Sequence, residues 1–254
     1  EAALVRLGIV NGTHAISCAL FASLRPYETL LSVTGAPYDT LAGVIGLSDK
    51  GFGSLMDYSV QYAQVDMMAD GKIDLDEIAK AVDIERPRVV FIQRSRGYTR
   101  RDALSIDDIG QICKTVRAIA PDTIIVVDNC YGEFVERLEP TQVGADLIAG
   151  SLIKNPGGGL APTGGYIVGR HELVERAAAR MTAPGIGGEC GPTLGQSRLL
   201  FQGLFMAPHT VAQALKTAVF CAAVMGQLGY STSPGVEDRR SDIIQMIDFG
   251  APEP

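Results

Sequence analysis

Short apolar runs alternate with helical patterns along most of the chain. The runs predict strands because they are brief, rich in β-branched residues and bounded by turn residues. They are residues 29–35, 59–66, 88–95, 123–129, 147–153 and 165–169. Strands that are apolar throughout and joined by helices are typical of a mainly parallel sheet covered on both faces. We therefore predict an α/β fold with α-β-α layers.

The segments between these runs show the spacing of amphipathic helices. The clearest is 105–120, where Ser105 is a predicted N-cap, Asp107 and Asp108 stand in the first turn, and apolar residues recur on one face. Further helices are predicted at 37–47 and 74–82. Residues 1–10 resemble the interior of a helix, and residues 11–24 a loop that becomes a helix from His14.

From residue 171 onward the pattern is helical. The predicted segments are 171–181, 191–205 and 207–229. The last of these is apolar around most of its circumference, so we expect it to be buried against the sheet or against a second subunit.

Composition excludes several classes of protein. A net charge of −7 and a pI near 5.0 argue against nucleic acid as the main partner, because phosphate binding needs a concentrated basic surface. The 5 cysteines are scattered without CxxC spacing, so neither a disulfide framework nor a metal site is predicted, and a cytoplasmic setting fits best. No apolar stretch reaches membrane-spanning length. The chain begins without Met and stops without a closing element, so we expect it to be part of a longer protein.

Two polar residues close neighbouring predicted strands. Asp128 ends 123–129 and Lys154 follows 147–153. Ligands of parallel sheets gather at the carboxyl ends of the strands, so a carboxylate and an amine can face one crevice there. This pair suits pyridoxal phosphate, since a lysine forms a Schiff base with its aldehyde and an aspartate keeps its ring nitrogen protonated. Taken singly, Asp128 is better explained as a cap of loop amides and Lys154 as a surface residue, and it is their combination with further motifs of the chain that favours a cofactor site.

A phosphate needs backbone amides that approach closely at a helix N-terminus. Gly12 permits a tight turn there, and Thr13 adds a hydroxyl before the helix. Ser151, three residues before Lys154, supplies a second hydroxyl. An ordinary N-cap and a small packing residue are the alternative explanations.

Three further residues are weaker candidates for cofactor contacts. Tyr38 could lay its ring over a flat cofactor, or simply follow Pro37 at a helix start. His14 could contact the ring or cap a helix. Arg96, in the basic loop 94–101, could bind a carboxylate or a cofactor oxygen, with a solvated loop as the alternative.

Several motifs together resemble a known family. They are "NGTHA", "GAPYDT", "QRSRGY", "VVDNCYGEF", "GADLIAGSLIKNPGGGLAPTGGYI" and "LFQGLFMAPH". The chain resembles, over nearly its whole length, the bacterial aluminium resistance or methionine gamma-lyase family proteins. These are relatives of the cystathionine lyases within fold type I of the pyridoxal-phosphate enzymes.

The resemblance implies a domain division and a set of roles. Residues 1–229 would be the large cofactor-binding domain, lacking an N-terminal segment, and 230–254 the start of a mostly missing small domain. Lys154 matches the Schiff-base lysine and Asp128 the ring-nitrogen partner. The phosphate matches are Gly12, Thr13 and Ser151, and the ring-stacking match is Tyr38.

The chain departs from the lyase pattern at two places, and a third feature of the pattern lies outside the chain. Ile153 stands where those lyases often have a hydroxyl, so one phosphate contact would come from elsewhere, such as a neighbouring subunit. "QRSRGY" replaces an asparagine near the cofactor hydroxyl, which leaves substrate and reaction specificity open. The arginine that binds the substrate carboxylate in the relatives lies beyond this sequence.

The hypothesis is β- or γ-elimination from an amino acid, most simply of a thiol, after Lys154 removes the α-proton. A lysine that acts as a base needs a lowered pKa, which we expect from an apolar pocket without carboxylates beside it. The alternatives are transamination or racemisation on the same scaffold, or a non-catalytic protein of metal stress tolerance. The resemblance implies a homodimer or homotetramer.

Overall fold

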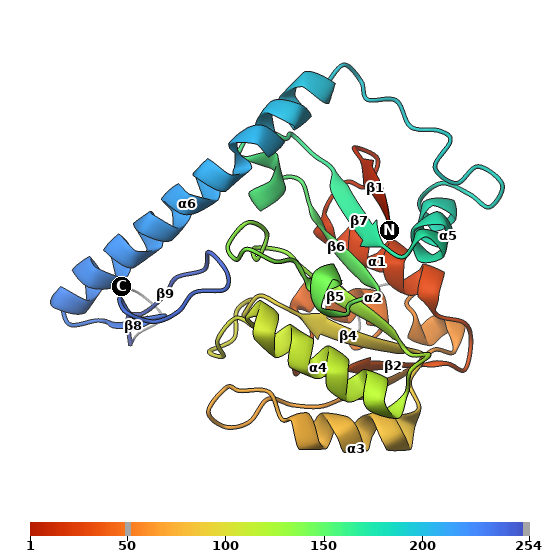
Figure 1. Cartoon of the computed structure of the whole chain (residues 1–254), viewed down its shortest axis with the longest axis horizontal. Helices are drawn as coiled ribbons and strands as arrows, with labels where there is room; N and C mark the ends of the chain where they lie inside the picture. Colours follow the sequence, from red (N-terminus) through yellow and green to blue (C-terminus); the bar gives the residue numbers. More distant parts are fainter. Residues whose placement is uncertain (49–51, 251–254) are drawn as a thin grey trace.

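The computed structural model describes residues 1–48 and 52–250. Its centre is a seven-stranded sheet in the order β1-β7-β6-β5-β4-β2-β3 (Figure 1). The strands are β1 Ala2–Arg6, β2 Thr29–Ser32, β3 Gln61–Gln64, β4 Val89–Gln93, β5 Ile124–Asp128, β6 Leu147–Ser151 and β7 Gly165–Gly169. The strands from β3 to β6 pair in parallel, whereas β7 runs antiparallel to both β6 and β1. The sheet is therefore mainly parallel, as predicted.

Six α-helices of the described residues accompany this sheet. They are α1 Gly12–Ser23, α2 Asp39–Ile45, α3 Leu75–Glu85, α4 Ile106–Ile119, α5 His171–Met181 and α6 Ser197–Gln227. Helices α1 to α5 lie against the sheet, while α6 extends away from it (Figure 1). Alternate residues of β5 belong to different cores: Ile124 and Val126 pack with α1 and α5, whereas Ile125 and Val127 pack with α3 and α4. Because successive strand side chains point to opposite faces, this division confirms the α-β-α layers.

The first strand was not predicted. Residues 1–10 were expected in a helix, but Ala2–Arg6 form β1 with only Leu4 fully buried, opposite Ile167 of β7. A short apolar segment fits either element, and here the open edge of β7 decides the outcome by supplying backbone partners. The next helix also begins earlier than expected, at Gly12, because the side chain of Asn11 accepts a hydrogen bond from His14 N.

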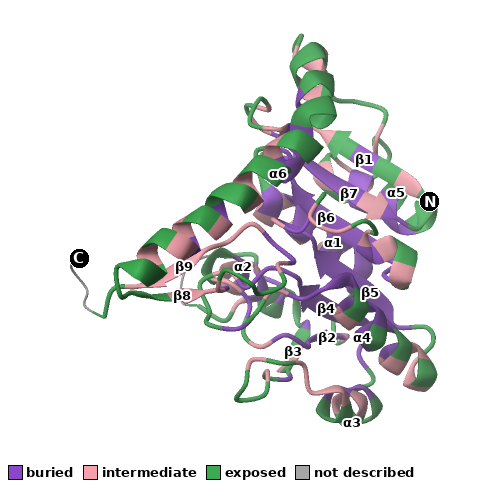
Figure 2. Cartoon of the chain, turned by 60° about the vertical axis from the view of Figure 1, so that its left-hand side comes forward, coloured by how far each residue is buried: buried purple, intermediate pink, exposed green. Residues whose placement is uncertain are grey.

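The two predicted C-terminal helices are one helix, α6, which runs through Pro208. The expected burial of this helix against the sheet is wrong: Figure 2 shows α6 mainly exposed, and Phe205 is 83% accessible. Its buried positions are small residues apart from Val211: Gly203, Ala207, Val211, Ala218 and Ala222. Packing of α6 against a second subunit stays a prediction. In the described ranges, no helix combines the length and apolarity needed to cross a membrane.

Residues after α6 form a small hairpin-like sheet of their own. Strand β8, Ser231–Ser233, pairs antiparallel with β9, Met246–Asp248, in a two-stranded sheet separate from the central one. This change of sheet agrees in position with the predicted division at 229/230, which stays a prediction. Residues 251–254 of the second predicted unit lie outside the described residues.

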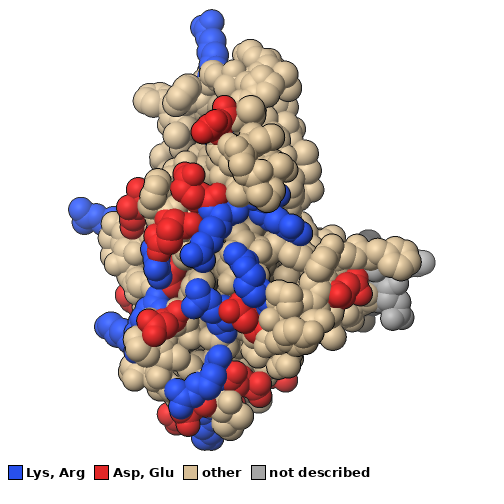
Figure 3. All heavy atoms as spheres, turned by 90° about the vertical axis from the view of Figure 1, so that its right-hand side faces the viewer, with Lys and Arg blue, Asp and Glu red and all other residues tan. Residues whose placement is uncertain are grey.

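Charged side chains of both signs are interleaved on the face seen in Figure 3. Ion pairs at the protein surface include Arg88 with Glu28 and Arg170 with Glu172. The face shown is therefore of mixed charge.

Helix α6 approaches the turn after Lys154 through glycines. A Cβ on Gly203 would lie 2.2 Å from the carbonyl oxygen of Gly157, and a Cβ on Gly158 would lie 2.3 Å from that of Gly203. Gly157 belongs to the 3₁₀ turn η3, Asn155–Gly157, directly after Lys154. The two backbones can approach only because these positions lack side chains.

We expect Gly203→Ala to destabilise the protein, against the usual helix preference. Alanine in an open helix is better than glycine by about 1 kcal/mol, but here its methyl group would strike backbone, at a cost of roughly 1–3 kcal/mol. The control is Gly226→Ala in the same helix, where a Cβ meets nothing within 4 Å. Urea unfolding should show a lower midpoint for Gly203→Ala and an equal or higher one for Gly226→Ala; equal effects would contradict the packing argument.

Candidate active site

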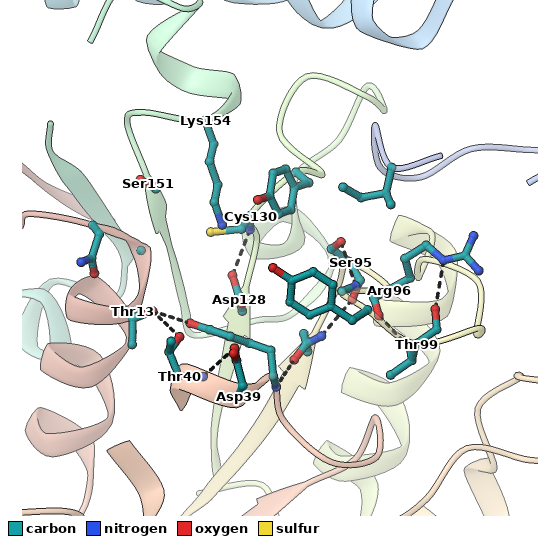
Figure 4. Close-up of a pocket in the computed structure, with 18 of the residues that line it drawn as sticks. Thr13, Asp39, Thr40, Ser95, Arg96, Thr99, Asp128, Cys130, Ser151 and Lys154 are labelled. Atoms are coloured by element: carbon teal, nitrogen blue, oxygen red, sulfur yellow. Dashed lines mark hydrogen bonds between the residues drawn. The ribbon is translucent and has the colours of Figure 1, made fainter. Parts of the chain in front are cut away.

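A cavity of about 690 Å³ lies at the carboxyl ends of the parallel strands (Figure 4). Several βα loops, the start of α1 and the segment before β9 line it. The lining residues are Asn11, Gly12, Thr13, Tyr38, Asp39, Thr40, Gln93, 95–99, Asp128, Cys130, Tyr131, Ser151, Ile153, Lys154 and 244–246. Most residues predicted for the site therefore meet in one cavity, at the place where parallel sheets bind ligands.

Lys154 and Asp128 approach each other in this cavity. Asp128 ends β5 and is buried, with Cys130 N donating to its Oδ1 at 3.0 Å. Burial raises the pKa of Asp128, and the charge of Lys154 opposes that rise. Figure 4 shows the Lys154 side chain descending toward Cys130 and Asp128. The amine and the carboxylate therefore line one cavity, and their roles toward a cofactor stay a prediction.

The expected pKa of Lys154 was wrong in direction. Burial lowers the pKa of Lys154, but the groups around the amine, including the Cys130 sulfur and the Asp128 carboxylate, outweigh it, so the pKa is raised. The prediction assumed a pocket without carboxylates beside the amine. Asp128 is distant in sequence, and only the pairing of β5 with β6 brings it there.

The start of α1 and the end of β6 form a small polar recess. The hydroxyl of Ser151 is fully buried and has no hydrogen-bond partner among the described residues. A Cβ on Gly12 would lie 3.1 Å from Cys130 Sγ and 3.4 Å from Ser151 Cβ, so the recess depends on that glycine. The first N–H groups of a helix lack intrahelical partners. An orphaned hydroxyl beside such groups fits a bound anion such as a phosphate.

Tyr38 and Thr13 lie side by side at the cavity wall. Their hydroxyl oxygens are 3.1 Å apart, and Thr13 Oγ1 is 3.0 Å from Thr40 Oγ1. Tyr38 N also donates to Gln93 Oε1 at 3.1 Å. Burial, followed by the charge of Asp128, raises the pKa of Tyr38, so its hydroxyl stays protonated. Tyr38 is the residue before α2 and is within the cavity, as the cofactor-stacking prediction requires.

Two predicted residues have their side chains engaged elsewhere. His14 does not line the cavity; its Nδ1 accepts a hydrogen bond from Val10 N at 3.3 Å. Arg96 does line it, but its guanidinium donates to Ser233 O at 2.8 Å and to Thr99 O at 3.2 Å. The structure therefore brings Arg96 to the segment after α6, not to Lys154.

Cys130 and Tyr131 were missed by the sequence reasoning. Both follow Asp128 closely and line the cavity. Burial, then the charge of Asp128, raises the pKa of Cys130 well above its ordinary value, so the group stays a thiol. The position of "CY" after a strand-ending aspartate was the available signal. No group of three or more His, Cys, Asp or Glu in the described parts of the chain is arranged to hold a metal ion.

A buried polar network lies behind the loop that follows β5. Tyr166 donates to Glu133 Oε1 at 2.6 Å, and the fully buried Arg94 donates to Asn129 Oδ1 at 2.7 Å. Asn129 in turn donates to Glu139 at 2.8 Å. Burial raises the pKa of Glu133 to about 8, which keeps it largely protonated at neutral pH. These contacts fix the backbone that carries Asp128.

Comparison with known proteins identifies the family. The methionine gamma-lyase family model matches residues 1–254, and the chain belongs to this family. The uncharacterized Bacillus subtilis protein YnbB is 50% identical over 250 residues, which are 98% of this chain and 59% of that protein.

Solved structures agree with this assignment. The carbon-sulfur lyase involved in aluminium resistance from Clostridium novyi is 52% identical, with a TM-score of 0.95 over 99% of this chain and 60% of that one. The pyridoxal-5′-phosphate dependent protein YhfS from Escherichia coli shares the fold at 22% identity, with a TM-score of 0.66 over 92% of this chain and 58% of that one. The chain therefore has the fold type I architecture and spans about 60% of its nearer relatives' length.

We expect Glu133→Gln to change the pH dependence of stability. A carboxyl with a pKa of about 8 in the folded state and about 4.5 when unfolded binds more protons when folded between these values. The free energy of unfolding therefore falls as pH rises from about 4.5 to 8, by on the order of a few kcal/mol. The amide introduced by Glu133→Gln would not titrate, yet it could still accept a hydrogen bond from Tyr166.

Urea unfolding at pH 5, 6.5 and 8 measures this effect. The stability difference between Glu133→Gln and the wild type should move in favour of the variant as pH rises. If the free energies of unfolding of the two proteins changed in parallel with pH, Glu133 would have the same pKa in the folded and unfolded states. Comparing the two proteins removes the contribution of other titrating groups, since these are shared.

Proposed function

We propose that the cavity binds pyridoxal 5′-phosphate and that the complete protein is a carbon-sulfur lyase acting on an amino acid. The observation that carries this proposal is that the Lys154 amine and the buried Asp128 carboxylate line one cavity, each at or just after the end of one of two adjacent strands. The unpartnered Ser151 hydroxyl beside the start of α1 supports it, because a phosphate would satisfy that group. Membership of the methionine gamma-lyase family supports the class of chemistry.

Each end of the cofactor has a candidate partner. Lys154 would hold the aldehyde carbon through Nζ, and Asp128 would pair with the ring nitrogen. Gly12, Thr13 and Ser151 would hold the phosphate with backbone N–H groups and hydroxyls. Tyr38 would lie beside the ring, where its own contact with Thr13 fixes its position.

When bound, pyridoxal phosphate supplies an aldehyde that bonds covalently to amines and a ring that withdraws electrons from the substrate Cα. Asp128 keeps the ring nitrogen protonated, since a buried carboxylate stabilises a nearby positive charge. Lys154, once its amine is free, accepts the Cα proton. Once Asp128 pairs with the ring nitrogen it would attract the Lys154 ammonium less, so the pKa of Lys154 would fall and a larger fraction of the lysine would be free amine at neutral pH.

The proposed substrate is a sulfur-containing amino acid that loses a thiol by β- or γ-elimination. Its carboxylate would be bound by residues beyond this chain, in a small domain that begins near residue 230. The exposed apolar side chains of α6, such as Phe205 and Phe220, support a homodimer or homotetramer as the working form. The free state of the described cysteines agrees with a cytoplasmic setting.

We expect pyridoxal phosphate to give the protein a visible absorption band that borohydride converts to a stable adduct on Lys154. Lys154→Ala should lose the band and the adduct, because Lys154 is the one lysine among the described residues that line the cavity. Lys114→Ala, on the exposed face of α4, is the matched control and should keep both. Peptide mass mapping after reduction measures the site. An adduct retained in Lys154→Ala would contradict the assignment.

Product analysis distinguishes elimination from transamination. With methionine, cysteine or cystathionine, elimination should release thiol, ammonia and keto acid in equal amounts, whereas transamination gives keto acid without thiol. Asp128→Asn preserves the shape of the side chain and the hydrogen bond from Cys130 N but removes the charge. We expect it to lower turnover by about 10²-fold or more while the Lys154 adduct still forms. Undiminished turnover would exclude the role of Asp128.

A further inference from the structure

The amine of Lys154 lies over an aromatic ring. Its Nζ is 4.0 Å from the centroid of the Tyr131 ring, within the range of a cation–π contact. Both residues are half-buried and line the same cavity. Because a cation–π contact strengthens when the cation is shielded from water, the ring stabilises the ammonium form here more than it would at the surface.

Tyr131 is held in an uncommon backbone conformation. Its φ is +70°, in the left-handed region that non-glycine residues adopt at a cost of roughly 1–2 kcal/mol. Asn155, the residue after Lys154, is buried and donates from Nδ2 to Tyr131 O at 3.1 Å and to Glu133 O at 2.9 Å. The side chain of Asn155 thus holds the loop that contains Tyr131 by two hydrogen bonds to its backbone.

The two contacts join the same pair of loops, one at the Tyr131 ring and one at its backbone. Lys154 reaches from the loop after β6 to the Tyr131 ring, and Asn155 reaches from that loop to the Tyr131 backbone. The other polar neighbours of the amine are the Asp128 carboxylate and the Cys130 thiol, which lie toward β5. Tyr131 contacts the ammonium through a ring face, so it holds the charge without competing as a proton acceptor.

We propose that Tyr131 is a positioning residue for Lys154: its ring holds the ammonium inside the cavity, and Asn155 fixes the ring in place. The inference rests on the proposed function only in taking Lys154 as the reactive amine. Tyr131 acts through Lys154 in two ways. It keeps Nζ on the Asp128 side of the cavity, and it sets the fraction of the lysine present as free amine at a given pH.

The test measures the ionisation of Lys154 in the full chain freed of any carbonyl ligand with hydroxylamine. The protein is labelled with acetic anhydride across a pH series, and the extent at Lys154 is followed by peptide mass spectrometry. The pH midpoint of labelling reports the pKa, and the plateau reports access. Lys114, exposed on α4, is the internal reference in every sample.

The decisive variant is Tyr131→Gly, which removes the ring and suits the left-handed backbone at this position. We expect the Lys154 midpoint to fall by about half to one pH unit, or roughly 3- to 10-fold more free amine below the midpoint. Tyr131→Phe keeps the ring and should keep the wild-type midpoint. Tyr98→Leu, a change at an exposed tyrosine on the cavity rim, is the matched control and should also keep it.

An unchanged midpoint in Tyr131→Gly overturns the proposal, even if the plateau rises because the amine is more accessible. A fall in Tyr131→Phe equal to that in Tyr131→Gly also overturns it, since the hydroxyl would then be responsible. If circular dichroism shows that the glycine variant is unfolded, Tyr131→Leu replaces it with the same two readings. The borohydride experiment on Lys154 tests cofactor binding separately, so failure of one proposal is distinguishable from failure of the other.

Discussion

The burial of the Asp128 carboxylate at the end of β5 is the constraint on which the cavity depends. A buried carboxylate is costly unless charge or hydrogen bonds compensate it. Here the carboxylate accepts a hydrogen bond from Cys130 N and lies near the Lys154 ammonium. Burial nevertheless outweighs both and raises the pKa of Asp128. Because its neighbours compensate the buried charge only in part, a further cation bound beside Asp128 would be stabilised. The protonated ring nitrogen of the proposed cofactor is such a cation.

The order of the strands in the sheet brings the other polar residues of the cavity close to Asp128. Parallel β5 and β6 lie next to each other, so their carboxyl ends bring Asp128 and Ser151 to one edge, with Lys154 in the loop beyond. Strand β7 then returns antiparallel and packs Tyr166 across Gly150, where a Cβ would lie 2.5 Å from the phenol oxygen. The polar network of Tyr166 is thereby placed behind the site without occupying it.

Much of this arrangement could be predicted from the sequence, because it depends on local signals. The buried strands are apolar runs, and the helix from Ser105 has a complete capping box. The predictions that were wrong concern features that depend on residues far away in the sequence. The strand β1 forms because β7 offers an open edge, and the pKa of Lys154 is raised because a carboxylate from another strand lies beside it. Tyr131 was missed because its left-handed turn has no signature in its own residue type.

The glycine contact between α6 and the turn after Lys154 has a mechanical consequence. Backbone there touches backbone, with Gly203 against Gly157 and Gly158, so there is no room for a side chain at these positions. The distance between α6 and the turn Asn155–Gly157 is therefore fixed by main-chain atoms, and that turn begins at the residue after Lys154. Any side chain added at Gly203 would have to push the helix away from this turn, so the seating of a long helix rests on the absence of a single methyl group.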